Sequence, residues 1–175
     1  MDRAVAELGR LDILVNNAAY QMFRDGIAQI PDGEWEHTFR ANIFAMHFLC
    51  NAAWPHLPPG GAVINTASIQ AYQPTPQFLP YASTKGAIVT FSKALAEEGA
   101  ERGIRVNVVA PGQVWTPLIP ATMPEEKARQ FGQDSPLGRP AQPAELAPIF
   151  VFPASADASY VTGEVVGVTG SKPLP

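Results

Sequence analysis

Tyr81 and Lys85 are the side chains of this sequence whose types and spacing most clearly suggest acid–base chemistry. They lie four residues apart at the start of a stretch with helical periodicity, so a helix would place both on one face, with the ammonium near the phenol. Ser68 comes thirteen residues earlier, at the end of a predicted strand, where parallel sheets place functional side chains. Taken alone, each has an ordinary alternative: a chance pair on a helix surface, and a turn or cap.

The chemistry expected of this pair is proton transfer by a phenol whose pKa the lysine lowers. An ordinary tyrosine pKa of about 10 makes the phenol a poor base at neutral pH. A cation at about 4 Å contributes on the order of 4 kcal/mol at an effective dielectric of about 20, or roughly three pKa units before screening. We therefore expect Lys85 to bring the pKa of Tyr81 into the working range of a general acid and base.

Alternating strand and helix patterns predict an α/β fold with a parallel sheet that positions these residues. Four short apolar runs predict buried strands, and two longer stretches with apolar residues three and four apart predict helices. The alternation is typical of βαβ units. The predicted strands span residues 11–17, 62–68, 104–111 and 164–170, and the predicted helices span residues 34–54 and 81–102.

Residues 113–143 predict a flap within a single domain that spans residues 1–175. This segment is rich in proline and glycine, contains short helical pieces and is too long for an ordinary connection. Its apolar residues would either line a substrate pocket or pack the flap itself: Trp115, Leu118, Ile119, Met123 and Phe131.

Composition excludes several classes of function. The chain has 175 residues, 46% of them hydrophobic, and a formal net charge of −4, which favours a globular domain with a real core and argues against a nucleic-acid partner. Cys50 is the only cysteine, so no intrachain disulfide can form and a cytoplasmic location is expected. The N-terminal residues lack the apolar core of a signal peptide, and the most apolar stretch is interrupted by His47 and Asn51, so no membrane segment is expected.

Motifs for other chemistries are missing. His37, His47 and His56 are ten and nine residues apart, which is no metal-ligand spacing on a helix, and no Cys-x-x-Cys pair accompanies them. There is neither a Gly-x-Ser-x-Gly elbow nor a P-loop. The sequence therefore predicts no metal site, serine hydrolase or nucleotide triphosphatase.

Six blocks in the same order make the sequence resemble the short-chain dehydrogenase/reductase family over nearly its whole length. They are LDILVNNAA at residues 11–19, Asn42 in FRANIFA, NTAS at 65–68, YASTKGA at 81–87, GIRVNVVAPGQVWTPL at 103–118 and VTGEVVGVTG at 161–170. The resemblance implies a Rossmann-like parallel sheet with flanking helices, and an oxidoreductase that interconverts an alcohol and a carbonyl with NAD or NADP.

The resemblance also implies roles for individual residues. Tyr81 would be the general acid and base, Lys85 would lower its pKa and hold the nicotinamide ribose, Ser68 would orient the substrate oxygen, and Asn42 would anchor a water linked to the lysine. Without the resemblance, Asn42 is equally well explained as a helix residue tolerated for packing. Further cofactor contacts are implied for Asn16, Asn17, Pro111, Gly112, Val114 and Thr116, with ordinary turns and a strand exit as the alternatives.

The sequence departs from the family pattern at its N-terminus and at three single positions. No glycine-rich phosphate loop precedes residue 11, so we expect a sheet that lacks the first strands, as in an N-terminally truncated member. Ala19 replaces a usual glycine, Pro153 is expected to interrupt a helix end, and Ser171 stands where a second glycine is common. Two functions therefore stay open: an enzyme, or a non-catalytic remnant that serves as an oligomerisation or binding module.

A homo-oligomer is expected from the surfaces that this organisation exposes. The strand at residues 11–17 would be an unpaired edge, which tends to pair with another chain. The two predicted helices resemble those through which the family packs its dimers, and their outer faces are expected to carry Phe44, Phe48, Val89 and Lys93.

Overall fold

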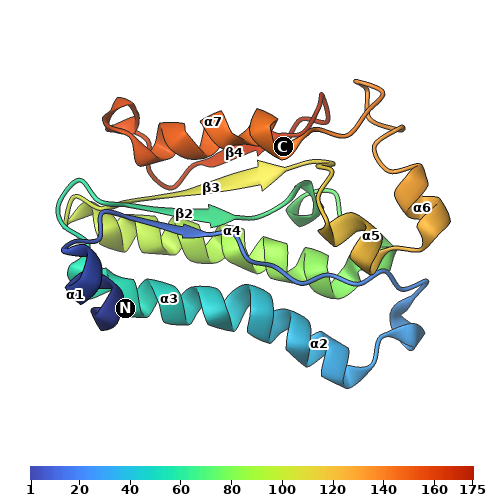
Figure 1. Ribbon diagram of the computed structural model, residues 1–175, viewed down its shortest axis with the longest axis horizontal. Coiled ribbons are helices and arrows are strands. Elements are labelled where there is room, and N and C mark those ends of the chain that lie inside the picture. Colours follow the sequence, from blue (N-terminus) through green and yellow to red (C-terminus); the bar gives the residue numbers. More distant parts are fainter.

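Four parallel strands form the sheet of the protein, as the computed structural model of residues 1–175 shows (Figure 1). Their order in space is the same as in sequence, β1-β2-β3-β4. The strands span Ile13–Asn16 (β1), Ala62–Thr66 (β2), Arg105–Pro111 (β3) and Val165–Val168 (β4). The α/β fold class and all four strands predicted from the apolar runs are confirmed, each shortened by one or more residues at its ends.

Helices cover the two faces of the sheet unequally. Helices α2, α3 and α4 lie on one face, and α7 alone covers the other (Figure 1). Two short helices, α5 and α6, follow the carboxyl end of β3, and α1 precedes β1. The α-helices span Asp2–Leu8 (α1), Asp32–Phe39 (α2), Ala45–Ala53 (α3), Leu79–Ala100 (α4), Leu118–Thr122 (α5), Glu125–Arg129 (α6) and Pro143–Ala154 (α7).

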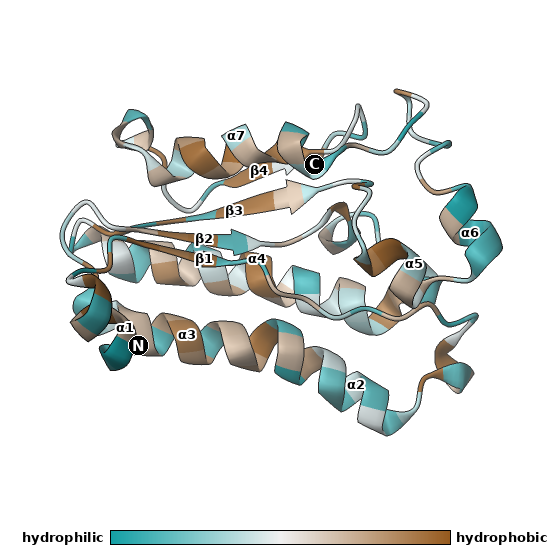
Figure 2. Ribbon diagram, in the orientation of Figure 1, coloured by the Kyte–Doolittle hydropathy of each residue, from teal (hydrophilic) through white to brown (hydrophobic).

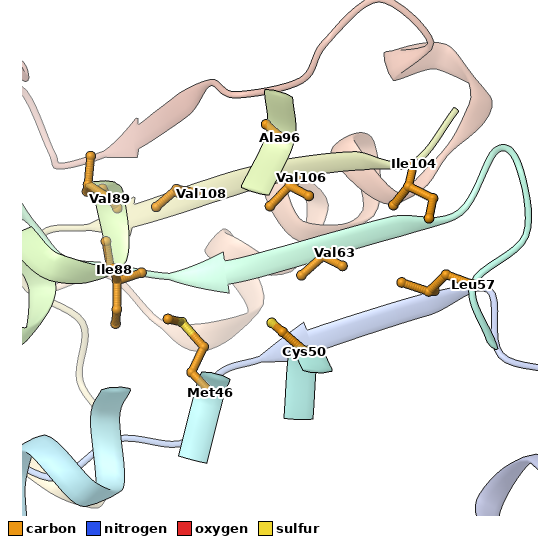
Figure 3. Close-up of a cluster of buried hydrophobic side chains, with 12 residues drawn as sticks. Met46, Cys50, Leu57, Val63, Ile88, Val89, Ala96, Ile104, Val106 and Val108 are labelled. Carbon is orange, nitrogen blue, oxygen red and sulfur yellow. The ribbon is translucent and has the colours of Figure 1, made fainter. Parts of the chain in front are cut away.

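The hydrophobic core lies between the sheet and helices α3 and α4 (Figure 3). Val63 of β2 and Val106 of β3 are completely buried, and Met46, Cys50 and Ile88 of the helices pack against this face. Strands of β-branched residues that are covered by helices are typical of a parallel sheet. This packing holds α4 against the sheet, and the first turns of α4 carry Tyr81 and Lys85.

The helix predicted over residues 34–54 contains a π-helical turn. Residues Arg40–Phe44 form this turn between α2 and α3, with Asn42 buried at its centre. In such a turn the backbone hydrogen bonds span five residues instead of the four of an α-helix, and π-helical turns are frequent at functional sites. Apolar periodicity alone did not predict it, because the spacing of apolar residues on either side is still compatible with one α-helix.

Two expectations for single residues are wrong. Val89 was expected on the outer face of its helix, but it is buried in the core, since α4 packs against both the sheet and the α2–α3 segment. Pro153 does not interrupt α7, which continues to Ala154. The Arg105 guanidinium donates to the carbonyl oxygens of Pro153 (2.6 Å) and Ser155 (3.1 Å) and so stabilises this helix end.

The edge strand and α7 present apolar side chains to solvent. β1 pairs only with β2, and its Ile13 and Val15 are 43% and 46% exposed. Strands and α7 are mostly hydrophobic in Figure 2, whereas α6 is hydrophilic. Val151 of α7 is 64% exposed. The unpaired edge predicted for the first strand is therefore present.

Candidate active site

A cavity of about 870 Å³ opens at the carboxyl ends of the strands. Asn17 follows β1, Ser68 lies just beyond β2, and Pro111 ends β3, so the parallel sheet brings all three to one edge. Eight of the ten predicted site residues line this cavity: Asn17, Ser68, Tyr81, Lys85, Pro111, Gly112, Val114 and Thr116. Asn16 and Asn42 do not; both line a neighbouring cavity of about 80 Å³.

Ser68 faces the cavity from the turn after β2. Its backbone is extended, and its side-chain oxygen accepts a hydrogen bond of 3.2 Å from the Gln70 backbone N–H, which caps a short 3-10 helix, Ile69–Ala71. Ser68 is therefore a helix cap, as the ordinary explanation from the sequence had it, and it also faces the cavity. The Ser68 hydroxyl also lowers the pKa of Tyr81, which places the two groups near each other at the cavity wall.

Lys85 and Tyr81 project together from the first turns of α4. The Lys85 ammonium nitrogen lies 5.1 Å from the centroid of the Tyr81 ring. It donates a hydrogen bond of 2.7 Å to the carbonyl oxygen of Thr66, the last residue of β2. Lys85 is only 2% exposed, and no carboxylate pairs with it. The lysine is thus held over the ring face rather than as a surface ammonium.

The expected pKa of Tyr81 is wrong in direction. Burial raises the pKa of Tyr81, and the hydrogen bond with Ser68 lowers it only in part. Burial also lowers the pKa of Lys85 from 10.5 to about 7, because nothing nearby compensates the desolvated charge. With a pKa of about 7, Lys85 is only about half charged at neutral pH, which limits how far it can stabilise a phenolate, and the Tyr81 phenol stays protonated.

Asn42 is a structural clamp behind the cavity. Its carboxamide oxygen accepts from the Tyr20 backbone N–H (2.7 Å), and its nitrogen donates to the Tyr20 carbonyl (2.9 Å) and to the Thr84 hydroxyl (3.0 Å). The Thr84 hydroxyl in turn donates to the Tyr81 carbonyl at 2.7 Å. Asn42 therefore fixes the chain after β1 against the first turn of α4, next to Tyr81 and Lys85.

Asn16 and Asn17 have different environments. The Asn16 carboxamide donates to Asn65 at 2.8 Å, and its own oxygen is buried without a hydrogen-bond partner. Asn65 continues the network by donating to Ser92 at 2.8 Å, which joins the sheet to α4. Asn17 is exposed, and its oxygen accepts a hydrogen bond of 3.1 Å from the Thr66 hydroxyl at the cavity wall.

The loop after β3 is held close to the C-terminal strand. The Gly112 N–H donates to the Val168 carbonyl at 2.9 Å, and a Cβ at Gly112 would lie 2.9 Å from the Thr169 Cα. Glycine is required by this close approach of two backbones. Val114 then forms a parallel bridge with Ala141, which ties the two ends of the segment 113–143 together.

Three features of the site escaped prediction from the sequence. Thr84 completes the clamp of Asn42, and Gln21 lines the cavity while it is only 6% exposed. Leu146 and Phe150 of α7 also line the cavity. The position of Thr84 one residue before Lys85 was a usable signal, whereas a single glutamine after a strand carries none.

Two further observations concern metal-ligating side chains and the length of the helices. No group of three or more histidine, cysteine, aspartate or glutamate side chains is arranged to hold a metal ion. None of the helices combines the length and the apolar character that crossing a membrane requires.

Comparison with known proteins gives consistent matches along nearly the whole chain. The family model described as enoyl-(acyl carrier protein) reductase matches residues 1–170. The oxidoreductase YhdF of Bacillus subtilis is 51% identical over 98% of this chain, which covers 60% of that protein. A glucose and ribitol dehydrogenase homolog of Oryza sativa subsp. japonica is 52% identical over 93% of this chain and is covered to 57%. The chain thus spans less than two thirds of these relatives.

Solved structures show the same architecture. The 3-ketoacyl-(acyl-carrier-protein) reductase of Brucella melitensis, solved with NADH, superposes with a TM-score of 0.88 and 30% sequence identity, over 98% of this chain and 71% of the reductase chain. The parallel sheet, the order of the sequence blocks and these matches agree. The chain belongs to the short-chain dehydrogenase/reductase family of oxidoreductases.

Proposed function

We propose that this chain carries the catalytic residues of a nicotinamide-dependent oxidoreductase that interconverts an alcohol and a carbonyl compound. The observation that carries the proposal is the meeting of Ser68, Tyr81 and Lys85 at the wall of one large cavity. Two relatives support it by their names, a glucose and ribitol dehydrogenase homolog and a 3-ketoacyl reductase solved with NADH. These names do not favour the alternative of a non-catalytic binding module.

The residues around the cavity fit a nicotinamide cofactor. The loop of Pro111, Gly112, Val114 and Thr116 lines the wall next to Lys85, and Gly112 keeps this loop close to the C-terminal strand. We assign to this loop the carboxamide of the nicotinamide, to Lys85 the adjoining ribose, and to Asn17 a contact farther along the cofactor. When bound, NAD(H) or NADP(H) supplies or accepts the hydride.

In carbonyl reduction, Tyr81 gives its proton to the substrate oxygen. The raised pKa keeps the phenol protonated at neutral pH, which is the state that a proton donor requires. Ser68 lines the same cavity, lowers the pKa of this phenol in part, and orients the same substrate oxygen. Removing the proton donor deletes a step of the reaction while it leaves the cavity nearly unchanged.

Lys85 holds the cofactor ribose next to Tyr81 and can release or take up a proton at near-neutral pH. Its ammonium is held by the Thr66 carbonyl, and its pKa of about 7 lets it exchange a proton under working conditions. The cavity of about 80 Å³ beside Thr66 is lined by Asn16 and Asn42 and is large enough for an ordered water. The Asn42 side chain has no amide hydrogen left for a water in this cavity, because both already donate to protein groups. Such a water would instead donate a hydrogen bond to the Asn16 side-chain oxygen, which has no protein partner.

We also propose that the protein is a dimer in the cytoplasm, packed through α3 and α4. Phe44 and Phe48 are 44% and 63% exposed, so the outer face of this helix layer offers aromatic surface for a partner copy. The burial of Val89 reduces the apolar surface available on α4, so the contact would depend mainly on α3.

Turnover by variants of one tyrosine tests the proposed reaction. The full chain is mixed with NADH or NADPH and a small aldehyde, and oxidation of the cofactor is followed by absorbance. Tyr81→Phe should lower the rate by more than about tenfold, a loss above about 1.4 kcal/mol of transition-state stabilisation. Tyr160→Phe is the matched control, because this tyrosine is fully exposed outside the cavity. A Tyr81→Phe rate equal to that of the control would contradict the proposal.

A further inference from the structure

Gln21 is a buried polar side chain at the wall of the cavity to which the proposed reaction assigns no role. It is 6% exposed, although a carboxamide is costly to bury unless it is hydrogen-bonded. Two other glutamines line the cavity, Gln70 and Gln113, but neither is buried to this degree. Gln70 accepts from the Thr75 backbone with its oxygen, and Gln113 donates to an exposed carboxylate.

The orientation of the Gln21 carboxamide follows from its partner. Its nitrogen lies 3.0 Å from the Thr122 hydroxyl oxygen, and that hydroxyl donates its own hydrogen to the Leu118 carbonyl at 2.7 Å. Because the hydroxyl hydrogen is used, Thr122 can only accept from Gln21, and the nitrogen must face it. The carboxamide oxygen of Gln21 is therefore left as an acceptor, and no protein group donates to it.

Two connections hold this acceptor in place at the wall of the cavity that Ser68, Tyr81 and Lys85 also line. Thr122 belongs to α5 of the flap, so the hydrogen bond from Gln21 joins the flap to the loop after β1. The preceding residue, Tyr20, is clamped through both its backbone N–H and its carbonyl by Asn42, which also holds the first turn of α4. Gln21 is thus positioned relative to Tyr81 by hydrogen bonds and not only by packing.

The charges that line the cavity indicate which kind of substrate group would donate to the Gln21 carboxamide oxygen. No aspartate or glutamate lines the cavity, and Lys85 is its only lysine or arginine. A cationic donor would find no opposite charge there, whereas a neutral hydroxyl needs only an acceptor. A substrate that covers this acceptor without offering a donor is disfavoured, because the acceptor then loses water and is left unpaired.

We propose that Gln21 is a specificity-determining residue that accepts a hydrogen bond from a second hydroxyl of the substrate, one on a carbon other than the reacting one. The inference rests on the proposed function for the place of the reacting carbon, and it narrows the substrates to hydroxylated alcohols and carbonyl compounds. The flap takes part because Thr122 orients the carboxamide.

Binding of a matched pair of alcohols tests this proposal without turnover. The dissociation constants of ribitol and of 1-pentanol, both with five carbons, are measured on the full chain by ligand-observed NMR with NADH present. Gln21→Met keeps the length of the side chain but removes the acceptor, and it should weaken ribitol about three- to tenfold relative to 1-pentanol. Gln21→Glu keeps an acceptor but loses the N–H that donates to Thr122, so it should retain only part of the preference. Gln130→Met, an exposed glutamine outside the cavity, is the control.

Each outcome separates recognition from the proposed reaction. An unchanged ratio in Gln21→Met, an equal loss of both alcohols, or no ribitol binding to the unchanged chain would overturn the role of Gln21. Aldehyde reduction is followed in parallel. Ribitol binding that depends on Gln21, without any turnover, would contradict the proposed reaction but support the role of Gln21. Turnover together with an unchanged ratio of the ribitol and 1-pentanol dissociation constants would support the reaction and contradict the role of Gln21.

Discussion

Burial of Lys85 without a carboxylate partner predicts that this residue costs the protein stability at neutral pH. The side chain is 2% exposed, and its one hydrogen bond is to the Thr66 carbonyl at 2.7 Å. Its pKa falls from 10.5 in an exposed lysine to about 7 because the charge is desolvated. We expect replacement by methionine, which has a similar length and no charge, to stabilise the fold.

The magnitude follows from the linkage between protonation and folding. At about 1.36 kcal/mol per pKa unit, the lowered pKa corresponds to a penalty of at most about 5 kcal/mol when the lysine is protonated in both states. Loss of the hydrogen bond to Thr66 offsets about 1 kcal/mol, so Lys85→Met should raise the free energy of unfolding by up to about 4 kcal/mol at about pH 6. Between about pH 7 and 10.5 the unfolded chain binds more protons than the folded chain. The stability of the unchanged protein therefore rises through this range, and the advantage of Lys85→Met shrinks.

Urea unfolding followed by tryptophan fluorescence measures this effect at about pH 6, 8 and 9.5. Lys93→Met is the control, because Lys93 is an exposed lysine of the same helix. A Lys85→Met variant that is less stable than the unchanged protein at about pH 6, or whose stability difference is the same at all three pH values, would refute the reasoning.

Three further predictions concern the clamp, the loop and the assembly. Asn42→Ala should lower the free energy of unfolding by about 2–4 kcal/mol in urea, since three hydrogen bonds are lost and buried backbone groups are left unpaired, whereas the exposed Asn51→Ala should change it little. Gly112→Ala should cost about 1–3 kcal/mol in the same assay because its Cβ would meet Thr169, and an unchanged stability would contradict that contact. Light scattering at micromolar concentration should give a mass above the 18.8 kDa of one chain, reduced by Phe48→Glu, and a mass of one chain for the unchanged protein would defeat the proposed dimer.

The sequence predicted the sheet and the helices well because both follow from the apolar pattern. Strands such as β2 and β3 are covered on both faces, so their apolar runs are continuous, and the long helix α4 has a clear period. The spacing of Tyr81 and Lys85 and the place of Ser68 predicted their meeting, because helix geometry and the parallel sheet leave little choice.

The electrostatics and the local exceptions could not be predicted. Spacing shows that Lys85 lies near Tyr81, but the depth of burial decides whether the lysine is charged, and the depth depends on the whole fold. The π-helical turn at Asn42 and the burial of Gln21 also depend on the tertiary structure, so the sequence pattern did not predict them. Each depends on hydrogen bonds to residues distant in sequence, such as Tyr20 and Thr122, which no local pattern encodes.

Hydride transfer itself is the most direct test of the proposed active site. The full chain is incubated with an aldehyde that also carries a hydroxyl group on another carbon. The cofactor is NADH or NADPH deuterated at nicotinamide C4, with the deuterium on one face of the ring in one sample and on the other face in a second sample. The alcohol product is analysed by mass spectrometry. The proposed function predicts deuterium on the carbinol carbon from one face of the cofactor only, with product formation nearly abolished in Tyr81→Phe and kept in Tyr160→Phe. Product without deuterium from either face, or equal product from Tyr81→Phe, would contradict a reaction at Ser68, Tyr81 and Lys85.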